Sequence, residues 1–372
     1  MKLTFVLPGF PSKPTGGFKI IYSYADFLAG NGYDVTIIHM YMMPAEKRFK
    51  VKFGKITLLF TLLKIIIRKV QLKISNKSLW DTSWYSFKNK VNFKFEWFPK
   101  ERIIPNADAI FATAYETADF INNLSKSKGE KFYFIQHFET WSASESEIIR
   151  TWKLPMNNIV IASWLQQISN SFEIESCLIP NFIDTSNFFQ IKRIESKQRD
   201  SVVMLYHFLT IKGSKDGIEA LKHIKIENPQ INIILFGTVE RPYNMPNDFT
   251  YFQNPDKDFL RDEIYNRAVI YLMPSYKEGW GLTATEAMAC GATLVSTDNG
   301  GVNDFAINNK TAIITPVSDV KAMISGIQLL LDNPEMRISM AYMGMKKIQQ
   351  FSIEKSGRKL MRLLELKTLY EK

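Results

Sequence analysis

Cysteine and histidine are scarce in this 372-residue chain, which contains two and four of them respectively. Cys177 and Cys290 offer no disulfide framework, and a reducing, cytoplasmic location is therefore expected. The four histidines are scattered along the chain without the spacing of zinc ligands. We accordingly predict no metal site.

The chain also lacks the roughly 20 consecutive apolar residues that a membrane span requires. Its most apolar stretch, residues 56–70, is interrupted by Lys64 and Arg68. Residues 1–9 are expected to form a short strand that ends in a turn rather than a signal peptide.

Acidic residues are missing between Lys47 and Lys77, although Lys and Arg are frequent there. A basic helix with a broad apolar face suits the headgroup plane of an anionic membrane, and we favour peripheral contact with the inner face of the plasma membrane. The alternative is a helix packed on the sheet with a solvated basic edge.

The net charge of +10 favours an acidic partner. Nucleic acid is not predicted as that partner, because the sequence contains no zinc-finger, aromatic RNA-binding or other nucleic-acid signature. Hydrophobic residues make up 46% of the chain, enough for packed interiors, and its length favours two domains.

Short apolar segments bounded by turn residues predict two series of strands. The segments are residues 3–7, 35–39, 109–113, 131–136 and 159–163, and then 202–206, 231–237, 269–273, 293–297 and 312–315. Helical patterns alternate with these strands, which predicts a parallel sheet in each half of the chain. The expected fold is α/β, with two Rossmann-like doubly wound domains facing each other across a cleft.

The expected boundaries follow from breaks in this alternation. We place the first domain at residues 1–185, with a basic and apolar insertion at 47–98, and a polar linker at 186–200. The second domain is expected at residues 201–350, and a terminal helix at 351–372.

The loop after residues 269–273 leads into a helix that starts around Gly281, Leu282 and Thr283. The free backbone N–H groups of such a start, at the positive end of the helix dipole, form an anion site. Glu278 lies just before the helix and Glu286 lies inside it. A diphosphate at the N–H groups, with sugar hydroxyls on either side, satisfies all of these groups.

The stretch from Glu278 to Gly291 reads Glu-Gly-x-Gly-Leu-x-x-x-Glu-Ala-Met-Ala-x-Gly. It resembles the signature of retaining GT-B glycosyltransferases of family 4, in which seven residues separate two glutamates. Residues 179–184 resemble the Ile-Pro-Asn-Gly-x-Asp segment of that family, with Phe182 in place of glycine. The family resemblance implies a GT-B fold, with a C-terminal helix that crosses back to the first domain.

Donor-site roles follow from the resemblance alone. It implies that Lys212 binds phosphate together with the N–H groups of residues 281–283, that Glu286 binds ribose and that Glu278 holds the donor sugar. The further donor contacts that it implies are Gly16, Gly17, His207, Gly237, Phe252 and Gln253, with Phe252 and Gln253 in a loop beside the base. Asn299, Gly300, Gly301 and Asp304 resemble the Gly-Gly-x-x-Glu ending of the family.

One departure from the family pattern affects the phosphate site. The family has Gly-Arg-x-x-x-x-Lys-Gly after the first strand of this domain, whereas this chain has Tyr206 and His207 at the first two positions. Arginine is always charged and grips phosphate with two donors, and histidine is cationic only when protonated. Either a diphosphate keeps His207 cationic, or another base such as Lys215 or Arg241 replaces the arginine, or donor binding is weak.

His137 is the candidate catalytic residue of the first half, beside Glu278 and Lys212 of the second. It follows a predicted strand, where family members place a histidine or an acid near the donor sugar; a packed or surface histidine is the alternative. Residues 113–118 and the Phe-Ile-Gln-x-x-Glu run at 134–139 resemble family 4 rhamnosyltransferases of surface-polysaccharide synthesis. Asp256-Lys257-Asp258 is interpreted as solvated surface.

The resulting hypothesis is a retaining glycosyltransferase that acts in cell-surface polysaccharide synthesis. Its partners are a dTDP- or UDP-linked sugar donor and a saccharide or lipid-linked acceptor, and it needs no cofactor and no metal. Two alternatives stay open: a non-catalytic GT-B protein that binds saccharide or acts as a scaffold, and a sugar-nucleotide epimerase.

Overall fold

The computed structural model describes residues 1–10, 14–41, 43, 82–197, 201–243 and 245–370. The basic segment between Lys47 and Lys77, expected as a membrane-contacting or packed helix, lies outside these residues. The chain divides into two compact units, the first formed by residues 1–160, 169–177 and 357–372, and the second by residues 161–168 and 178–356.

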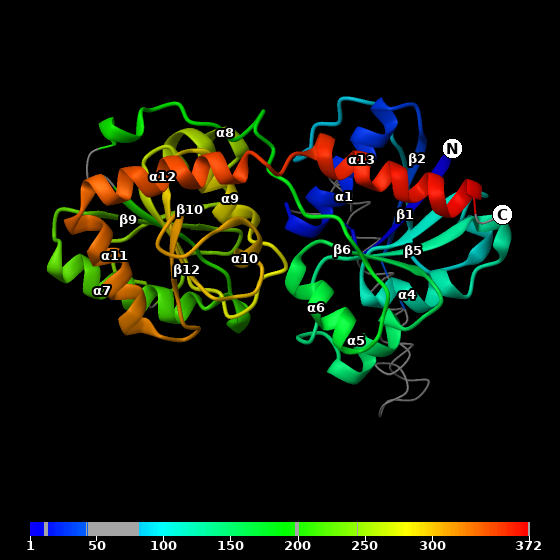
Figure 1. Ribbon diagram of the computed structural model, residues 1–372, viewed down its shortest axis with the longest axis horizontal. Helices are drawn as coiled ribbons and strands as arrows, with labels where there is room; N and C mark the ends of the chain where they lie inside the picture. The colour runs from blue at the N-terminus through cyan, green and yellow to red at the C-terminus, as the bar shows by residue number, and fades with distance from the viewer. Residues whose placement is uncertain (11–13, 42, 44–81, 198–200, 244, 371–372) are drawn as a thin grey trace, which may run out of the picture. The chain divides into compact units, whose positions relative to one another are not determined.

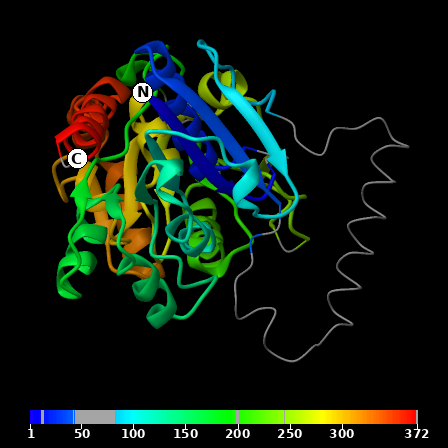
Figure 2. The same cartoon turned by 90° about the vertical axis from the view of Figure 1, so that its right-hand side faces the viewer.

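The first unit contains a seven-stranded sheet with the order β3-β2-β1-β4-β5-β6-β7. The strands are β1 (Lys2–Pro8), β2 (Asp34–Met40), β3 (Asn92–Glu96), β4 (Ala109–Ala112), β5 (Glu130–Ile135), β6 (Asn157–Val160) and β7 (Cys177–Leu178). Each pairing from β3 to β6 is parallel. Figure 2 shows β1, β2 and β3, in blue and cyan, side by side and pointing the same way.

The helices of the first unit connect these strands. They are α1 (Gly16–Gly30), α4 (Tyr115–Asn122), α5 (Glu145–Trp152) and α6 (Ser163–Ser171), which begins in the second unit. The last helix, α13 (Ile353–Glu365), reaches the first unit at Gly357, which lies against the ring of Phe27 on α1. Figure 1 shows α13 in red.

The second unit contains a six-stranded parallel sheet with the order β10-β9-β8-β11-β12-β13. The strands are β8 (Ser201–Leu205), β9 (Asn232–Gly237), β10 (Thr250–Gln253), β11 (Ala268–Met273), β12 (Thr293–Thr297) and β13 (Ala312–Thr315). The helices are α7 (Ser214–Glu227), α8 (Lys257–Phe259), α9 (Leu282–Ala289), α10 (Val302–Phe305), α11 (Val320–Asp332) and α12 (Pro334–Ile348). A π-helical turn, Leu260–Tyr265, precedes β11.

The core of the second unit explains why its two central strands, β8 and β11, are mostly apolar. Alternate residues of β8 and β11, such as Met204 and Leu272, are fully buried in one cluster with the inner faces of α7 and α11. Side chains on the other face of β11 and β12 pack against α9. Because both faces of a parallel sheet are covered, its central strands are nearly continuous apolar runs, as the sequence predicts.

The predicted α/β class with two Rossmann-like sheets is confirmed, but three strands were not predicted: the two-residue edge strand β7, and two longer ones. Residues 92–96, assigned to an insertion that interrupts the alternation, form β3 at one edge of the first sheet. Residues 250–253 form β10 at an edge of the second, so Phe252 and Gln253 end a strand rather than lie in a loop. Both are edge strands, and neither is a fully buried apolar run.

Residues 186–197, expected in a linker, lie in the second unit. Phe188 is buried there, 5.9 Å from the ring of Tyr265, and Ile194 is also buried. Asp184 accepts hydrogen bonds from the backbone N–H groups of Ser186 and Asn187 at 3.2 Å, which turns the chain at the start of this stretch.

Gly213 is the position at which the second unit most clearly requires glycine. Its φ is +62°, and a Cβ atom there would lie 1.9 Å from the carbonyl oxygen of Pro274. Gly213 therefore lets the chain after β8 approach the chain after β11.

We predict that Gly213→Ala lowers the melting temperature at least twice as much as Gly32→Ala. Gly32 also has a positive φ, of +86°, but a Cβ atom there meets no described atom within 4 Å. Gly32→Ala therefore carries only the left-handed strain of about 1–2 kcal/mol, whereas Gly213→Ala adds a collision with backbone. Calorimetric melting of both variants tests this, and equal decreases would show that the close approach at Pro274 is unimportant.

Candidate functional site

The candidate site lies at the carboxyl ends of β8 and β11, where ligands bind in open parallel sheets. The loop after β11 leads into α9 at Gly281, which is the N-cap residue and has a φ of +107°. The backbone N–H of Glu278 donates to the carbonyl of Asn299 at 3.0 Å, which joins this loop to the one after β12. The N-terminus of α9 and Glu278 are thereby placed beside each other, as the sequence predicts.

Lys212 and Glu278 form a salt bridge at this edge. Lys212 Nζ donates to both carboxylate oxygens of Glu278 at 2.8 Å, and the side chains are only 24% and 13% exposed. Ser275 Oγ donates to Glu278 Oε1 at 2.7 Å. The predicted phosphate-binding and sugar-binding residues therefore neutralise each other.

The surroundings of this salt bridge form a small cavity. Its lining residues come from the ends of β8 and β11, the turn before α7 and the first turn of α9: Leu205, Lys212, Tyr271, Leu272, Met273, Pro274, Ser275, Glu278 and Thr283. The backbone N–H of Tyr276 donates to the carbonyl of Ile211 at 2.8 Å and fixes the turn that carries Lys212. The cavity, of about 10 Å³, holds about one water molecule. The cation, carboxylate and helix N-terminus around it are the kinds of group that bind phosphate and sugar hydroxyls.

Glu286 lies deeper than Glu278. It is on α9, 5% exposed, and its Oε2 accepts a hydrogen bond of 3.2 Å from the hydroxyl of Tyr265. Glu286 is not among the residues that line the cavity.

His207 follows β8, and its hydrogen bonding fixes its tautomer. Its Nδ1 faces the backbone N–H of Leu209 at 3.1 Å and must accept, so the proton of the neutral ring is on Nε2. Burial lowers the pKa of His207, the Lys212 ammonium lowers it further, and Glu278 opposes this. At neutral pH the ring is therefore uncharged at the position where the family pattern has arginine.

The two bases considered as substitutes for that arginine are placed differently. Arg241 donates to the carbonyl oxygens of Phe249 at 2.9 Å and Pro246 at 2.6 Å, so its guanidinium stabilises the segment before β10. Lys215 is exposed in the first turn of α7.

The other predicted donor contacts of the second unit are at the ends of β9 and β10. A Cβ atom at Gly237 would lie 2.5 Å from the carbonyl oxygen of Tyr206, so the ends of β8 and β9 require glycine there. Phe252 packs its ring 4.9 Å from that of Phe259, and Gln253 is exposed.

Gly16, Gly17 and His137 belong to the first unit and form a separate group. Gly16 and Gly17 start α1, and Gly17 lies next to the amide of Gln136, which follows β5. The ring of His137 meets Trp141 edge to face, with centroids 4.4 Å apart, and Trp141 is 45% exposed. His137 thus packs edge to face against an exposed indole rather than in the core.

Three further residues support the loops of the site but have no local sequence pattern. Trp164 Nε1 donates to the carbonyl of Gly279 at 3.2 Å, and the indole covers Gly300. The backbone N–H of Ser163 donates to Asp304 at 3.0 Å. Ser163 and Trp164 precede the signature by more than a hundred residues, so only tertiary structure reveals their role. The third residue is Tyr265, which donates to Glu286.

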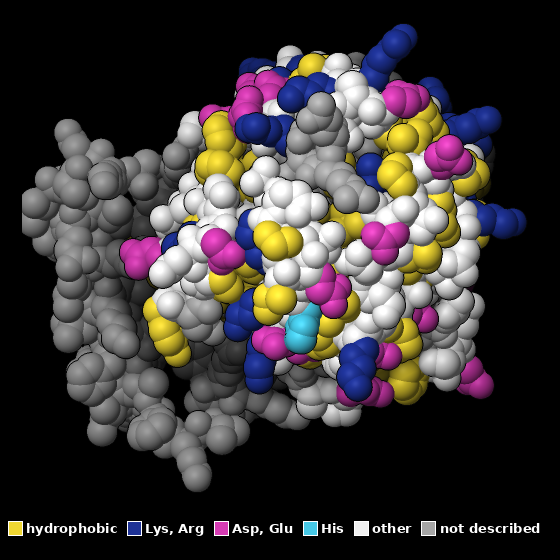
Figure 3. Space-filling model, turned by 90° about the vertical axis from the view of Figure 1, so that its left-hand side faces the viewer, with side chains coloured by type: hydrophobic (Ala, Val, Ile, Leu, Met, Phe, Trp, Pro, Cys, Tyr) yellow, Lys and Arg dark blue, Asp and Glu magenta, His cyan; other side chains and the backbone are white. Residues whose placement is uncertain are grey.

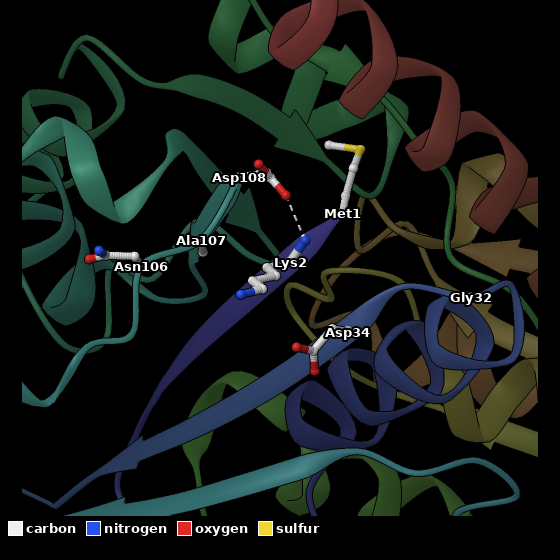
Figure 4. Close-up of a pocket in the computed structure, with 7 residues that line it drawn as sticks. All are labelled: Met1, Lys2, Gly32, Asp34, Asn106, Ala107 and Asp108. Atoms are coloured by element: carbon white, nitrogen blue, oxygen red, sulfur yellow. Dashed lines mark hydrogen bonds between the residues drawn. The ribbon is translucent and has the colours of Figure 1, made fainter.

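Two other polar features lie away from this edge. Asp256 caps α8 by accepting from the N–H of Phe259 at 2.8 Å, and Asp258 pairs with Arg261, so Asp256-Lys257-Asp258 is surface structure. A hollow lined by Lys2, Asp34, Asn106 and Asp108, among others, lies at the amino ends of β1, β2 and β4 (Figure 4). Ligands of parallel sheets bind at the opposite, carboxyl edge. No group of three or more His, Cys, Asp or Glu side chains among the described residues is arranged to hold a metal ion.

We predict that the Lys212–Glu278 pair contributes a coupling free energy of about 1 kcal/mol, because both side chains are mostly shielded from solvent. A double-mutant cycle of Lys212→Met and Glu278→Gln, followed by urea titration, measures it. The pair Arg267–Glu263, with both side chains 50% exposed, serves as the control and should show almost no coupling. Equal coupling in the two cycles would contradict the desolvated salt bridge.

Comparisons with known proteins point to one family for the second unit. Residues 186–347 match the family model described as glycosyl transferases group 1. A capsular polysaccharide biosynthesis glycosyltransferase, CapM of Staphylococcus aureus, is 23% identical over 37% of this chain and 38% of its own length. An N-acetylgalactosaminyltransferase of Campylobacter jejuni that acts on a diphospho-undecaprenol-linked sugar is 25% identical over 59% of this chain and 57% of its own length. The chain thus spans from about a third to about half of the length of these relatives.

Solved structures match over nearly the whole chain. HepE of Anabaena in complex with UDP-glucose has a TM-score of 0.72 at 13% identity, covering 98% of this chain and 99% of its own. A sucrose-phosphate synthase of Thermosynechococcus elongatus has a TM-score of 0.70 at 16% identity, covering 97% and 98%. Residues 186–347 therefore carry the sequence pattern of the glycosyl transferases of group 1, and the chain has the GT-B fold of glycosyltransferases.

Proposed function

We propose that this chain is a retaining glycosyltransferase that transfers a sugar from a uridine diphosphate donor to a saccharide or lipid-linked saccharide during cell-surface polysaccharide synthesis. The observation that carries the proposal is the Lys212–Glu278 pair in the cavity at the start of α9. The match of residues 186–347 to group 1 supports it. The polysaccharide and lipid-linked substrates named for CapM and the Campylobacter enzyme support the proposed acceptor.

Donor binding would separate the salt bridge. The diphosphate competes with Glu278 for Lys212 Nζ, and the N–H groups at the start of α9 stabilise its charge. The Glu278 carboxylate then accepts from hydroxyls of the donor sugar, and Glu286 accepts from the ribose. Lys212, Glu278 and Glu286 thus each have a hydrogen-bonding partner in the complex, so the contact that Lys212 and Glu278 lose is replaced.

The chemical step needs no base from the protein. An acceptor hydroxyl oxygen attacks the anomeric carbon from the face that the diphosphate leaves, and the bond between that carbon and the phosphate oxygen breaks. UDP leaves with the bonding electron pair, and a phosphate oxygen takes the proton of the acceptor hydroxyl. Lys212 and the α9 N–H groups stabilise the charge that develops on the leaving phosphate, so the proposal includes no metal.

We predict that the chain binds UDP and that Glu286→Ala weakens binding about tenfold or more, because charge-assisted hydrogen bonds are worth about 1.5–3 kcal/mol. Calorimetric titration with UDP, dTDP and GDP, with and without EDTA, measures this. Glu263→Ala, which removes a half-exposed carboxylate of the same unit, should leave affinity unchanged. If the chain binds dTDP more tightly than UDP, the proposed donor base changes but the proposed binding site does not.

The neutral His207 favours a second candidate function, a non-catalytic GT-B protein that binds saccharide. With an uncharged ring at the arginine position, the phosphate site has one cation fewer than the family pattern. Failure to bind any of the three nucleotides would exclude the transferase and leave this alternative. Loss of affinity in Glu286→Ala would exclude it, since a saccharide site has no need of a ribose contact.

We also propose that residues 47–77 bring the chain to anionic membrane, where a lipid-linked acceptor resides. The segment has ten Lys and Arg residues and no Asp or Glu, so it accounts for the whole net charge of +10. By contrast, Figure 3 shows Lys and Arg interspersed with Asp and Glu on a described face of the second unit. No helix among the described residues is long and apolar enough to span a bilayer.

We predict that the chain floats with vesicles containing phosphatidylserine and that added salt releases it. Changing Lys64, Arg68 and Lys69 to Gln should weaken this roughly a hundredfold, at about 1 kcal/mol per basic residue near an anionic surface. Changing Lys310, Lys321 and Lys355, which are exposed on the second unit, removes the same charge and should have little effect. Equal losses in the two triple variants would contradict a localised membrane site.

A further inference from the structure

Tyr265 and Glu286 form a hydrogen-bonded pair beneath the candidate donor site. The two side chains come from different elements, the π-helical turn before β11 and the second turn of α9. Tyr265 Oη donates to Glu286 Oε2 at 3.2 Å, and both residues are buried, with exposures of 0% and 5%. Burial and the neighbouring carboxylate hold the pKa of Tyr265 well above its usual value, so its hydroxyl stays protonated.

The ring of Tyr265 is held in place by three other aromatic side chains. Its centroid lies 5.7 Å from that of Phe236, 5.9 Å from Tyr271 and 5.9 Å from Phe188, all tilted or edge to face. Phe236 and Tyr271 are on β9 and β11, and Tyr271 also lines the cavity with Lys212 and Glu278. A ring packed on several sides can hold its hydroxyl in one direction, and that direction is toward Glu286.

We infer that the Tyr265 hydroxyl positions Glu286 for the ribose hydroxyls of a nucleoside diphosphate and thereby sets the preference for ribose. This inference rests on the proposed function and names a residue of the same site. By donating to one carboxylate oxygen, Tyr265 restrains the rotamer of Glu286 and thus the direction in which the carboxylate accepts hydrogen bonds. Tyr265 itself does not contact the nucleotide.

A purely structural role would have different consequences. If Tyr265 only filled the core, removing its hydroxyl would affect every ligand of the site equally. A positioning role affects only ligands that carry the ribose hydroxyls, and it disappears once Glu286 is removed, because residues that act through one another are not additive. Ligand chemistry therefore separates the two roles.

The experiment is calorimetric titration of Tyr265→Phe, Glu286→Ala and the double variant with UDP and with 2′,3′-dideoxyuridine diphosphate. We expect Tyr265→Phe to weaken UDP binding about five- to tenfold, as for one hydrogen bond to a charged group. We expect dideoxyuridine diphosphate to change less than about twofold. The double variant should bind UDP no more weakly than Glu286→Ala alone.

Tyr342→Phe is the matched control. Tyr342 donates to Glu195 at 2.6 Å on the surface of the same unit, so the variant removes a Tyr–Glu hydrogen bond without touching the cavity residues. It should leave both affinities unchanged. Tyr265→Met, which fills the buried space without a hydroxyl, provides a second variant if Tyr265→Phe melts well below the unaltered chain.

If Tyr265→Phe weakens the binding of both ligands equally, or of neither, the inference is overturned. UDP binding by the unaltered chain would still support the proposed function. An additive loss in the double variant would overturn the inference as well. If the unaltered chain binds neither ligand, the proposed function fails, and the inference fails with it.

Discussion

The salt bridge between Lys212 and Glu278 is the interaction on which the candidate site depends. β8 and β11 are adjacent parallel strands, so the chain segments that leave them must share one edge of the sheet. Gly213 lets these segments approach closely, and the opposite charges of Lys212 and Glu278 meet there. Without the salt bridge, a largely buried cation and carboxylate would each remain in a confined, weakly solvated hollow, which is unfavourable.

The same arrangement explains how a site with a partly buried salt bridge can also bind a charged ligand. A diphosphate offers Lys212 a partner of the same sign as Glu278, and sugar hydroxyls offer Glu278 donors in place of the ammonium. Ser275 and Tyr265 each donate to one of the two signature glutamates, so both carboxylates are oriented before any ligand arrives. Preorganisation of this kind reduces the ordering that binding requires.

Much of the fold was predictable because buried parallel strands are continuous apolar runs, as at residues 202–205 and 269–273. The edge strands β3 and β10 were missed because Asn92–Glu96 and Thr250–Gln253 are partly exposed and include polar residues. The proximity of Glu278 to the start of α9 followed from local sequence. The contacts of Trp164 with Gly279 and of Tyr265 with Glu286 did not, since they join residues that no local pattern connects.

The state of His207 illustrates a different limit of sequence reasoning. The substitution for arginine is visible in the sequence, but its consequence depends on burial, on the nearby ammonium and on the N–H of Leu209 that fixes the tautomer. Burial and the Lys212 ammonium lower the pKa of His207, so the ring is neutral at neutral pH.

A crystal structure with UDP bound tests the central claim most directly. Our account predicts that the diphosphate lies at the N-terminus of α9, within hydrogen-bonding distance of Lys212 Nζ and of the N–H groups of Leu282 and Thr283, with the Lys212–Glu278 contact broken. UDP bound elsewhere, or bound here with that salt bridge intact, would contradict it.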